Sequence, residues 1–286
     1  MSISMNSQSA LHEVESRCTQ ERPPRCQSLC PLGLDARAFL GHAAEGRWSD
    51  ARKQLERYLP LPGLLARICD HPCEQGCLRG DLGGAVNLHG LEIFCTEHLG
   101  VQTRSLPMPR KQKRIAVIGA GLAGLVCAWD LAGKGYPVTV FHEGEPQAQL
   151  LSCWPVLAGA GAAALDAEWE ALGRRGVRFE QARTDAACLQ QAAGEYDGVL
   201  LDAGALPELA PPESGMDAQI LHWRDNICCA GWASVTPTGH RFASASRQAG
   251  QGRSAARTLE RQVAGVSLTA ARDTDERSLF TELDGI

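Results

Sequence analysis

The sequence has no long hydrophobic run and little excess of charge. None of its apolar stretches is long enough to span a bilayer, and the N-terminal residues contain no apolar core of signal-peptide type. The formal net charge of the 286 residues is -5, so the composition indicates neither nucleic acid nor an anionic membrane surface as a partner. We therefore expect a cytoplasmic, globular protein without a membrane span, and the length allows two domains.

Cys-x-x-Cys pairs are also missing, although the chain has 12 cysteines. Disulfides are improbable in a reducing compartment, so metal binding is the better interpretation. Structural zinc sites usually contain Cys-x-x-Cys pairs or Cys/His sets, and His71 between Cys69 and Cys73 is interpreted as loop filler. Cys30 is followed by Pro31, an ending familiar from iron–sulfur loops, so iron–sulfur is favoured over zinc. The clustered cysteines are Cys18, Cys26, Cys30, Cys69, Cys73, Cys77 and Cys95.

The N-terminal third otherwise has the pattern of short amphipathic helices. We expect four of them, over residues 11–17, 36–44, 49–58 and 85–100. Asp35 is a suitable N-cap for the second helix. Glu92 and Cys95 are three residues apart in the fourth helix and therefore share a face. The five cysteines beyond residue 100 are scattered and are interpreted as ordinary thiols.

A dinucleotide-binding turn follows. Residues 115–118 form a short apolar run that predicts a buried parallel strand, and a G-x-G-x-x-G sequence comes directly after it. Gly119 allows the tight turn, Gly121 lets the backbone approach a pyrophosphate, and Gly124 lets helix and strand pack closely. The residues expected to hold the pyrophosphate are Gly119, Ala120, Gly121, Leu122, Ala123 and Gly124.

The segment after the turn completes this pattern. Residues 122–131 predict a helix whose N-terminus offers free N–H groups to phosphates, and residues 138–141 predict a second strand. Glu143 lies just past that strand, where it can accept hydrogen bonds from ribose hydroxyls. An acid at this position favours FAD or NAD over NADP.

The rest of the chain predicts further strands over residues 177–182 and 198–201 and a helix over residues 162–174. The second G-x-G, in residues 157–161, is interpreted as a helix start. Only about 20 residues lie between Ala205 and Asn226. This segment is too short for a second nucleotide-binding domain, which needs on the order of 100 residues. The basic linker over residues 102–113 is interpreted as a solvated crossing segment, and residues 267–286 as a polar tail.

Four segments in this order resemble the small subunit of glutamate synthase, and are similar to the N-terminal part of dihydropyrimidine dehydrogenase and to flavin subunits of ferredoxin–NADPH transhydrogenases. The segments are RC…PPRCQSLCP, LPGLLARICDHPCEQGCLRG, AVNLHGLEIF and RIAVIGAGLAGL. The resemblance covers about the first half of the chain. It implies two 4Fe-4S clusters in a helical domain, followed by an FAD domain that normally contains an inserted NADPH domain. The chain looks like this family with the inserted NADPH domain removed.

The resemblance also implies the cluster ligands. One cluster would take Cys18, Cys26 and Cys77, and the other would take Cys30, Cys69, Cys73 and Glu92. Glu21 stands where the family has a fourth cysteine for the first cluster. Three alternatives follow: Glu21 is an oxygen ligand, Cys95 or a partner supplies the fourth ligand, or that cluster is labile or lost. A carboxylate such as that of Glu21 is a harder and less usual ligand for iron than a thiolate. The remaining interpretation is that Glu21 faces solvent.

The flavin half departs further from the family pattern. The glycine pair expected in residues 147–155 is absent. The family's Ala-Thr-Gly strand end is Asp202, Ala203 and Gly204 here, and its Gly-Asp strand end is Gly231 and Trp232. The resemblance implies a late strand over residues 227–232 and a closing helix over residues 243–263. It still places Gly204, Gly231 and Trp232 at the flavin, with the N-terminus of the closing helix at the flavin's pyrimidine edge.

We therefore predict an α+β chain in which an all-α iron–sulfur domain (residues 1–105) precedes an α/β Rossmann-like FAD domain (residues 106–265) and a tail (residues 266–286). The predicted function is that of an electron-transfer subunit, relaying electrons between FAD and 4Fe-4S clusters with other redox subunits of a larger oxidoreductase complex rather than acting as an enzyme alone. Two alternatives stay open: an NAD-linked oxidoreductase that holds NAD at the fingerprint, and a flavin-free scaffold.

Overall fold

The computed structural model describes Ser9, His12, Glu13, Ser16, Cys18 and residues 23–101, 108–160, 162–217, 219–235 and 241–269. Most of the expected helix over residues 11–17, part of the linker and almost all of the tail lie outside these residues. The chain divides into two units. The helical unit contains residues 1–59 and 69–103, and the sheet unit contains residues 60–68 and 104–270. We expected residues 60–68 in the helical domain, but they belong to the sheet unit.

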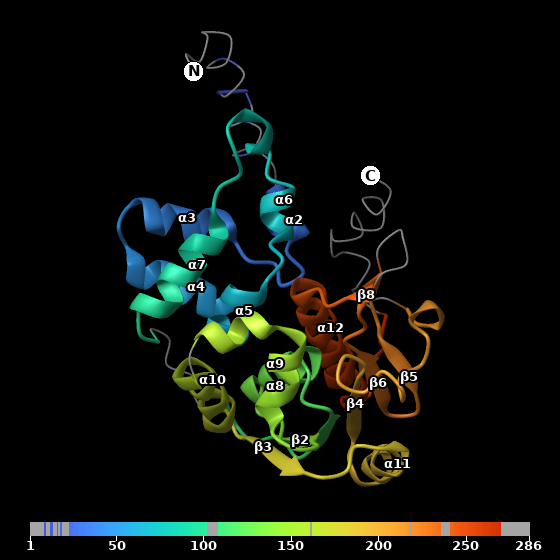
Figure 1. Cartoon of the computed structure of the whole chain (residues 1–286). Coiled ribbons are helices and arrows are strands. Elements are labelled where there is room, and N and C mark those ends of the chain that lie inside the picture. The colour runs from blue at the N-terminus through green and yellow to red at the C-terminus, as the bar shows by residue number, and fades with distance from the viewer. Residues whose placement is uncertain are drawn as a thin grey trace. The chain divides into compact units, whose positions relative to one another are not determined.

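The helical unit is built from short helices (Figure 1). They are α2 (Arg25–Leu29), α3 (Ala36–Ala44), α4 (Trp48–Tyr58), α6 (Pro72–Gln75), η1 (Gly80–Leu82) and α7 (Leu88–His98). The predicted cap of α3 is confirmed, because the Asp35 carboxylate accepts a hydrogen bond from the N–H of Ala38. Asn87 caps α7 in the same way through the N–H of Gly90. Helix α4 packs against α3 and α7 around the buried side chains of Phe39 and Leu55.

The sheet unit contains a six-stranded sheet of order β3-β2-β1-β4-β6-β5, in which only the edge strand β5 is antiparallel. The strands are β1 (Ile115–Ile118), β2 (Val138–His142), β3 (Val177–Gln181), β4 (Gly198–Asp202), β5 (His222–Arg224) and β6 (Ile227–Ala230), with a separate hairpin of β7 (Ser234–Val235) and β8 (Arg241–Phe242). The helices are α5 (Pro62–Ile68), α8 (Leu122–Gly133), α9 (Pro146–Cys153), η2 (Pro155–Ala160), α10 (Ala162–Arg174), α11 (Ala186–Glu195), η3 (Glu213–Gly215) and α12 (Ala245–Val263).

Helices cover both faces of this sheet (Figure 1). Ala116 and Ile118 of β1 belong to a buried cluster that includes Leu189 of α11. Val117, between them, faces α8, since a Cβ on Gly124 of that helix would contact its side chain. Helix α12 packs along α8 on the same side. This is the doubly wound arrangement expected of a Rossmann-like domain, and it confirms the predicted fold class.

Strand β1 lies between β2 and β4, with a register that pairs Ile115 with both Val138 and Gly198. The chain therefore crosses to opposite sides of β1, and in open α/β sheets ligands bind outside the carboxyl ends of the strands at such a point. The residues after β1, β2, β4 and β6 all lie at this edge of the sheet. No helix among the described residues is long and apolar enough to cross a membrane.

Candidate iron–sulfur and flavin sites

The loop after Cys30 surrounds its sulfur with backbone donors. Burial raises the pKa of the Cys30 thiol, whereas the N–H groups of Leu34 and Leu32, and to a smaller extent that of Gly33, lower it. The Gly33 N–H also donates to the Cys30 carbonyl at 2.8 Å and closes a turn at Pro31, which itself has no N–H to offer. Hydrogen bonds to sulfur stabilise a thiolate and are among the features that set the potential of iron–sulfur clusters. The Cys-Pro sequence therefore has the local geometry of a cluster loop.

Two further cysteines and a carboxylate lie around Cys30. The negative charges of Cys30 and Glu92 raise the pKa values of the Cys69 and Cys73 thiols, after the larger effect of burial. Burial and the charge of Glu92 likewise raise the pKa of Cys30. These four groups thus lie within electrostatic reach of one another, and the structure brings together the complete ligand set that the resemblance implies. We refer to Cys30, Cys69, Cys73 and Glu92 as the Cys30 group.

His71 belongs to the same neighbourhood, and its interpretation as loop filler was wrong. Its side chain is buried, and one ring nitrogen lies 3.4 Å from Oε2 of Glu92. Its backbone N–H contacts the Cys69 sulfur at 3.4 Å, and its ring stacks on that of His89. A positive φ of 47° turns the chain at His71, so that Cys69 and Cys73 can both face Cys30. His71 therefore holds both a thiol and the carboxylate in place.

A second group contains Cys18, Cys26 and Cys77. Burial and the charges of Cys18 and Cys77 raise the pKa of the Cys26 thiol, whereas the N–H of Gln27 and the charge of Arg37 lower it. Arg37 donates a hydrogen bond to the backbone carbonyl of Cys18, and its buried Nε has no hydrogen-bond partner among the described residues. A buried donor without a partner near the Cys26 thiol and the Cys18 backbone fits an anionic group at this position.

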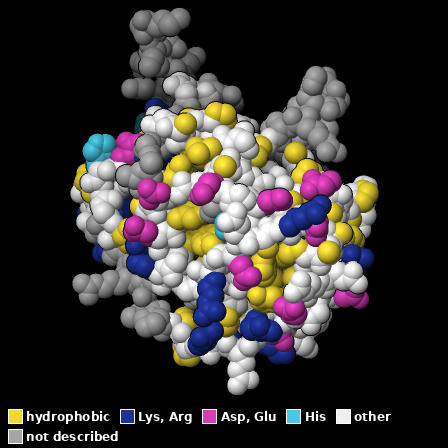
Figure 2. Space-filling view, turned by 60° about the horizontal axis from the view of Figure 1, so that its bottom comes forward, with side chains coloured by type: hydrophobic (Ala, Val, Ile, Leu, Met, Phe, Trp, Pro, Cys, Tyr) yellow, Lys and Arg dark blue, Asp and Glu magenta, His cyan; other side chains and the backbone are white. Residues whose placement is uncertain are grey.

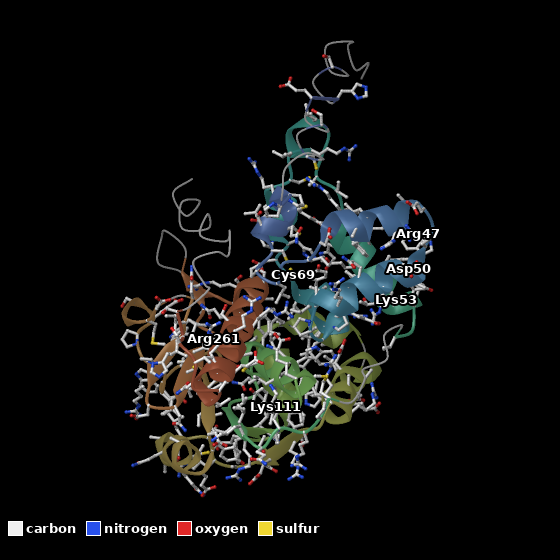
Figure 3. All side chains as sticks on the ribbon, turned by 180° about the vertical axis from the view of Figure 1, so that it is seen from behind. Arg47, Asp50, Lys53, Cys69, Lys111 and Arg261 are labelled. Carbon is white, nitrogen blue, oxygen red and sulfur yellow. The ribbon has the colours of Figure 1, made fainter. Side chains whose placement is uncertain are left out.

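The fourth ligand of this second group remains a prediction. Glu21 lies outside the described residues. Cys95 is buried beside Arg52 and Glu92, and Cys18, Cys26 and Cys77 are not among the groups that shift its pKa. Besides burial, Glu92 is the predicted ligand whose charge raises the pKa of Cys95, and none of the six candidate cysteines does so. Figure 3 shows Cys69 of the Cys30 group in the helical unit.

The cysteine groups are open rather than tightly closed. In the part of the chain that the structure describes, no three His, Cys, Asp or Glu side chains converge as closely as a single metal ion requires. A cubane takes one ligand on each of its four irons and spreads its ligands more widely than one ion does. One buried and two partly buried thiols, together with the Glu92 carboxylate and N–H groups directed at sulfur, fit a cationic iron–sulfur core. When bound, such clusters pass single electrons.

The glycine turn of the sheet unit has the predicted construction. Gly119 adopts a φ of 100°, and its N–H donates to the carbonyl of Phe141 on β2. Gly124 packs helix α8 against β1, because a Cβ there would come within 2.9 Å of the Val117 side chain. The N–H groups of Leu122 and Ala123 have no partner among the described residues, as at any helix N-terminus, and can bind an anion. Glu143 is exposed just after β2.

The other predicted flavin residues follow the ends of β4 and β6. Gly204 and Gly231 lie against each other, since a Cβ on Gly204 would be 2.8 Å from the Gly231 carbonyl oxygen. The backbone N–H groups of Gly231 and Trp232 both donate to Oε1 of Gln251 on α12, at 2.8 and 3.1 Å. The Trp232 indole donates to the Pro211 carbonyl. Gly231 and Trp232 are therefore held by the protein itself, and Gln251 is a structural partner that the sequence did not indicate.

Asp202 lies at the centre of these glycines, fully buried. Its carboxylate accepts hydrogen bonds from the N–H groups of Gly124 at 2.6 Å, Gly204 at 2.9 Å and Ala205 at 3.2 Å. Burial raises its pKa to about 6, and these three donors oppose the rise. Asp202 therefore caps helix α8 from behind the turn and leaves the first two N–H groups of the helix for a ligand. The turn, the exposed acid and the free donors fit a dinucleotide such as FAD, whose isoalloxazine supplies hydride and single-electron chemistry when bound.

The stability of the chain should depend on the protonation of Asp202. Because its folded pKa is raised from 3.8 to about 6, its contribution to the free energy of unfolding is fully present below about pH 4 and is lost as pH rises through 6. The wild type should therefore lose about 3 kcal/mol relative to Asp202→Asn between pH 4 and pH 7. Urea unfolding of both proteins across this range measures the difference.

Asp185→Asn is the matched control, because the N–H groups of Cys188 and Ala187 lower the pKa of this exposed N-cap. Its contribution is present at neutral pH and disappears as pH falls, so the difference should run in the opposite direction. A stability difference for Asp202→Asn that does not change with pH would contradict the buried, titrating carboxylate.

Comparison with known proteins separates the same two units. Residues 1–103 match the family described as dihydropyrimidine dehydrogenase domain II, 4Fe-4S cluster. Residues 114–194 match the family described as glucose inhibited division protein A. The chain joins a 4Fe-4S domain of dihydropyrimidine dehydrogenase domain II type to an FAD-dependent oxidoreductase domain. This confirms the family resemblance drawn from the cysteine segments and the glycine turn.

Several curated proteins are similar to part of this chain. The chain is 34% identical over 120 residues to the NADPH-Fe(3+) oxidoreductase subunit beta of Geobacter sulfurreducens, a match that covers 41% of this chain and 18% of that protein. It is 32% identical over 142 residues to the NADP(+)-dependent formate dehydrogenase subunit beta of Moorella thermoacetica, covering 41% and 20%. It is 25% identical over 218 residues to the glutamate synthase (NADPH) small chain of Mycobacterium tuberculosis, covering 74% and 45%. The chain thus spans less than half the length of each of these relatives.

Proposed function

We propose that this chain is an electron-transfer subunit that relays electrons between FAD at the glycine turn and 4Fe-4S clusters in the helical unit. The observation that carries the proposal is the Cys30 group, in which three thiols and Glu92 come together in a chain that also contains the dinucleotide turn. The relatives named above are subunits of NADPH-linked or NADP-linked oxidoreductases, which supports a place inside a complex.

We also propose that this chain does not oxidise NADPH directly. Between Gly204 and Ile227 the described residues form only η3 and the edge strand β5, with no second strand–turn–helix nucleotide site. The family's inserted NADPH domain belongs at this point of the chain. Electrons must therefore reach the flavin from another subunit or leave through one. The clusters would then be the natural route, since they accept one electron at a time from a reduced flavin.

To test this, anaerobically purified, FAD-containing protein is mixed with NADPH and an artificial electron-accepting dye, and reduction of the dye is measured. We expect protein that was reduced with dithionite and then freed of excess reductant to reduce the dye, and we expect NADPH to give no dye reduction above background. Dithionite titration followed by electron paramagnetic resonance should also give a reduced-cluster signal. NADPH-dependent turnover at an ordinary enzyme rate of about 1–1,000 per second would contradict the proposal.

A flavin-free scaffold is the second candidate function, and one observation favours it. Asp202 places a carboxylate, ionised above about pH 6, behind the glycine turn at which a pyrophosphate would bind. Two like charges near each other in a buried site repel strongly. Protein that retains iron but takes up no FAD, even at pH 5.5 where Asp202 is mostly neutral, would establish the scaffold. Uptake that improves at this lower pH would instead support the flavin site.

A further inference from the structure

A cavity of about 620 Å³ lies in the sheet unit, away from the glycine turn. Its lining includes Arg114 just before β1, Pro137 just before β2 and Gly176 just before β3. These positions are the amino ends of three neighbouring parallel strands, whereas the glycine turn follows the carboxyl end of β1. The cavity is therefore separate from the dinucleotide site, and its volume is within the range of small-molecule sites.

The charged side chains that line this cavity are all positive. Its lining contains five arginines and no Asp or Glu, and the arginines are Arg110, Arg114, Arg174, Arg175 and Arg178. Arg174 forms an exposed ion pair with Glu170, and Arg114 donates to the Glu195 carbonyl. Among the described residues, the other three arginines form no ion pair within 4 Å. Figure 2 shows one face of the surface, with several Lys and Arg side chains gathered in the lower part of the view.

Basic residues often lie at helix C-termini, where they interact with the negative end of the helix dipole. That explanation covers Arg174 and Arg175 at the end of α10, but Arg110 and Arg114 come from the segment before β1 and Arg178 from β3. Two stretches of the chain, residues 110–114 and 174–178, thus bring guanidinium groups to one hollow.

Packing holds some of these arginine side chains in place before any ligand binds. The Arg175 guanidinium lies 3.7 Å from the centre of the Trp129 ring, and a Cβ on Gly133 would be 2.7 Å from its Nη1. Burial lowers the pKa of Arg175, and its one acidic neighbour, Asp130, is already paired with Arg253. The wall before β1 is held as well, since the N–H of Lys111, labelled in Figure 3, donates to the Gly135 carbonyl. A held guanidinium loses little entropy when an anion binds to it.

We propose that this cavity binds a small, multiply charged anion of the phosphoanhydride class, either free pyrophosphate or the diphosphate of a nucleotide. Guanidinium groups match phosphate oxygens through paired hydrogen bonds, and several of them around one hollow suit a ligand with two or three negative charges. Three arginines without an ion-pair partner supply that charge, and the cavity has room for a nucleoside as well as its phosphates. The site does not depend on the proposed electron relay.

The test is isothermal titration of the full chain, saturated with FAD, against pyrophosphate, ADP, adenosine and citrate. We expect pyrophosphate and ADP to bind, adenosine not to bind, and affinity to fall as salt is raised. Tighter binding of ADP than of pyrophosphate would identify a nucleotide, and equal binding would identify the free anion. Arg178→Gln and Arg110→Gln should each weaken binding by about tenfold. Both side chains are exposed, so these variants should fold like the wild type.

Arg224→Gln is the matched control. Arg224 also lies over a tryptophan ring, that of Trp223, and is exposed in the same unit, but it is not part of the cavity lining. Its replacement should leave binding unchanged. Three results would overturn the proposal: no binding of either phosphate compound, equal losses in the cavity and control variants, or tighter binding of citrate than of pyrophosphate. Binding of poly-glutamate without any binding of the small phosphates would overturn it too, in favour of an acidic protein partner.

Discussion

Replacing Cys73 with alanine should remove about four irons and four acid-labile sulfides per chain while leaving the FAD content unchanged. Cys73 is buried beside Cys30 and Glu92, so its loss takes one of four ligands from a group whose members already interact. The flavin is unaffected because its turn is in the other unit. Iron, sulfide and flavin analyses of anaerobically purified protein, with the visible absorption of the cluster, measure the change.

Cys95→Ala is the matched control, since Cys95 is also a buried thiol of the helical unit and also lies near Glu92. It should keep all of the iron. Equal iron content in Cys73→Ala and wild type would contradict the assignment of the Cys30 group. Loss of iron in Cys95→Ala, with Cys73→Ala unaffected, would mean that the ligand carried over from the family is the wrong cysteine.

Gly124→Ala should lower both the FAD content and the stability of the sheet unit. The new Cβ would lie 2.8 Å from the Gly119 carbonyl oxygen and 2.9 Å from the Val117 and Asp202 side chains, so α8 must move away from β1. We expect a loss of about 1–3 kcal/mol in the free energy of unfolding, even though alanine favours a helix over glycine by about 1 kcal/mol. FAD affinity should fall at least tenfold, because the displaced N–H groups are those that face the pyrophosphate.

Gly194→Ala separates this effect from the general consequence of adding a methyl group to a helix. Gly194 is exposed on α11, and a Cβ there would contact nothing within 4 Å. Its replacement should leave FAD unchanged and raise the free energy of unfolding by up to about 1 kcal/mol. Urea unfolding and flavin titration of the two variants side by side provide the comparison. Retention of FAD by Gly124→Ala would mean that the turn does not hold the cofactor.

Local patterns predicted the elements that position both sites. The apolar run before Gly119, the glycine spacing and the following helical periodicity placed β1 and α8 correctly, because each of these signals is contained in a few adjacent residues. The Asp35 cap of α3 was predicted for the same reason. The Cys30 group was found through a family resemblance, since four ligands from three separate segments have no periodicity that sequence reasoning can detect.

Residues whose role depends on the approach of distant segments were missed or misread. His71 looked like loop filler because its contact with Glu92 forms only when α7 packs beside it. Asp202 was noticed as a departure from a family motif, but its hydrogen bond to Gly124 follows from the sheet order that puts β4 next to β1. The same sheet order brings together two arginine-containing stretches, residues 110–114 and 174–178, and their approach to each other could not be read from either stretch alone.

The measurement that tests the central claim most directly is the content of iron, acid-labile sulfide, zinc and FAD per chain, in protein purified without oxygen. We predict one FAD per chain. The chain should hold about eight irons if Cys18, Cys26 and Cys77 also bind a cluster, and about four if only the Cys30 group does. In both cases the number of sulfides should equal the number of irons. Zinc in place of iron would contradict the iron–sulfur assignment, and iron without flavin would leave a scaffold where we propose a relay.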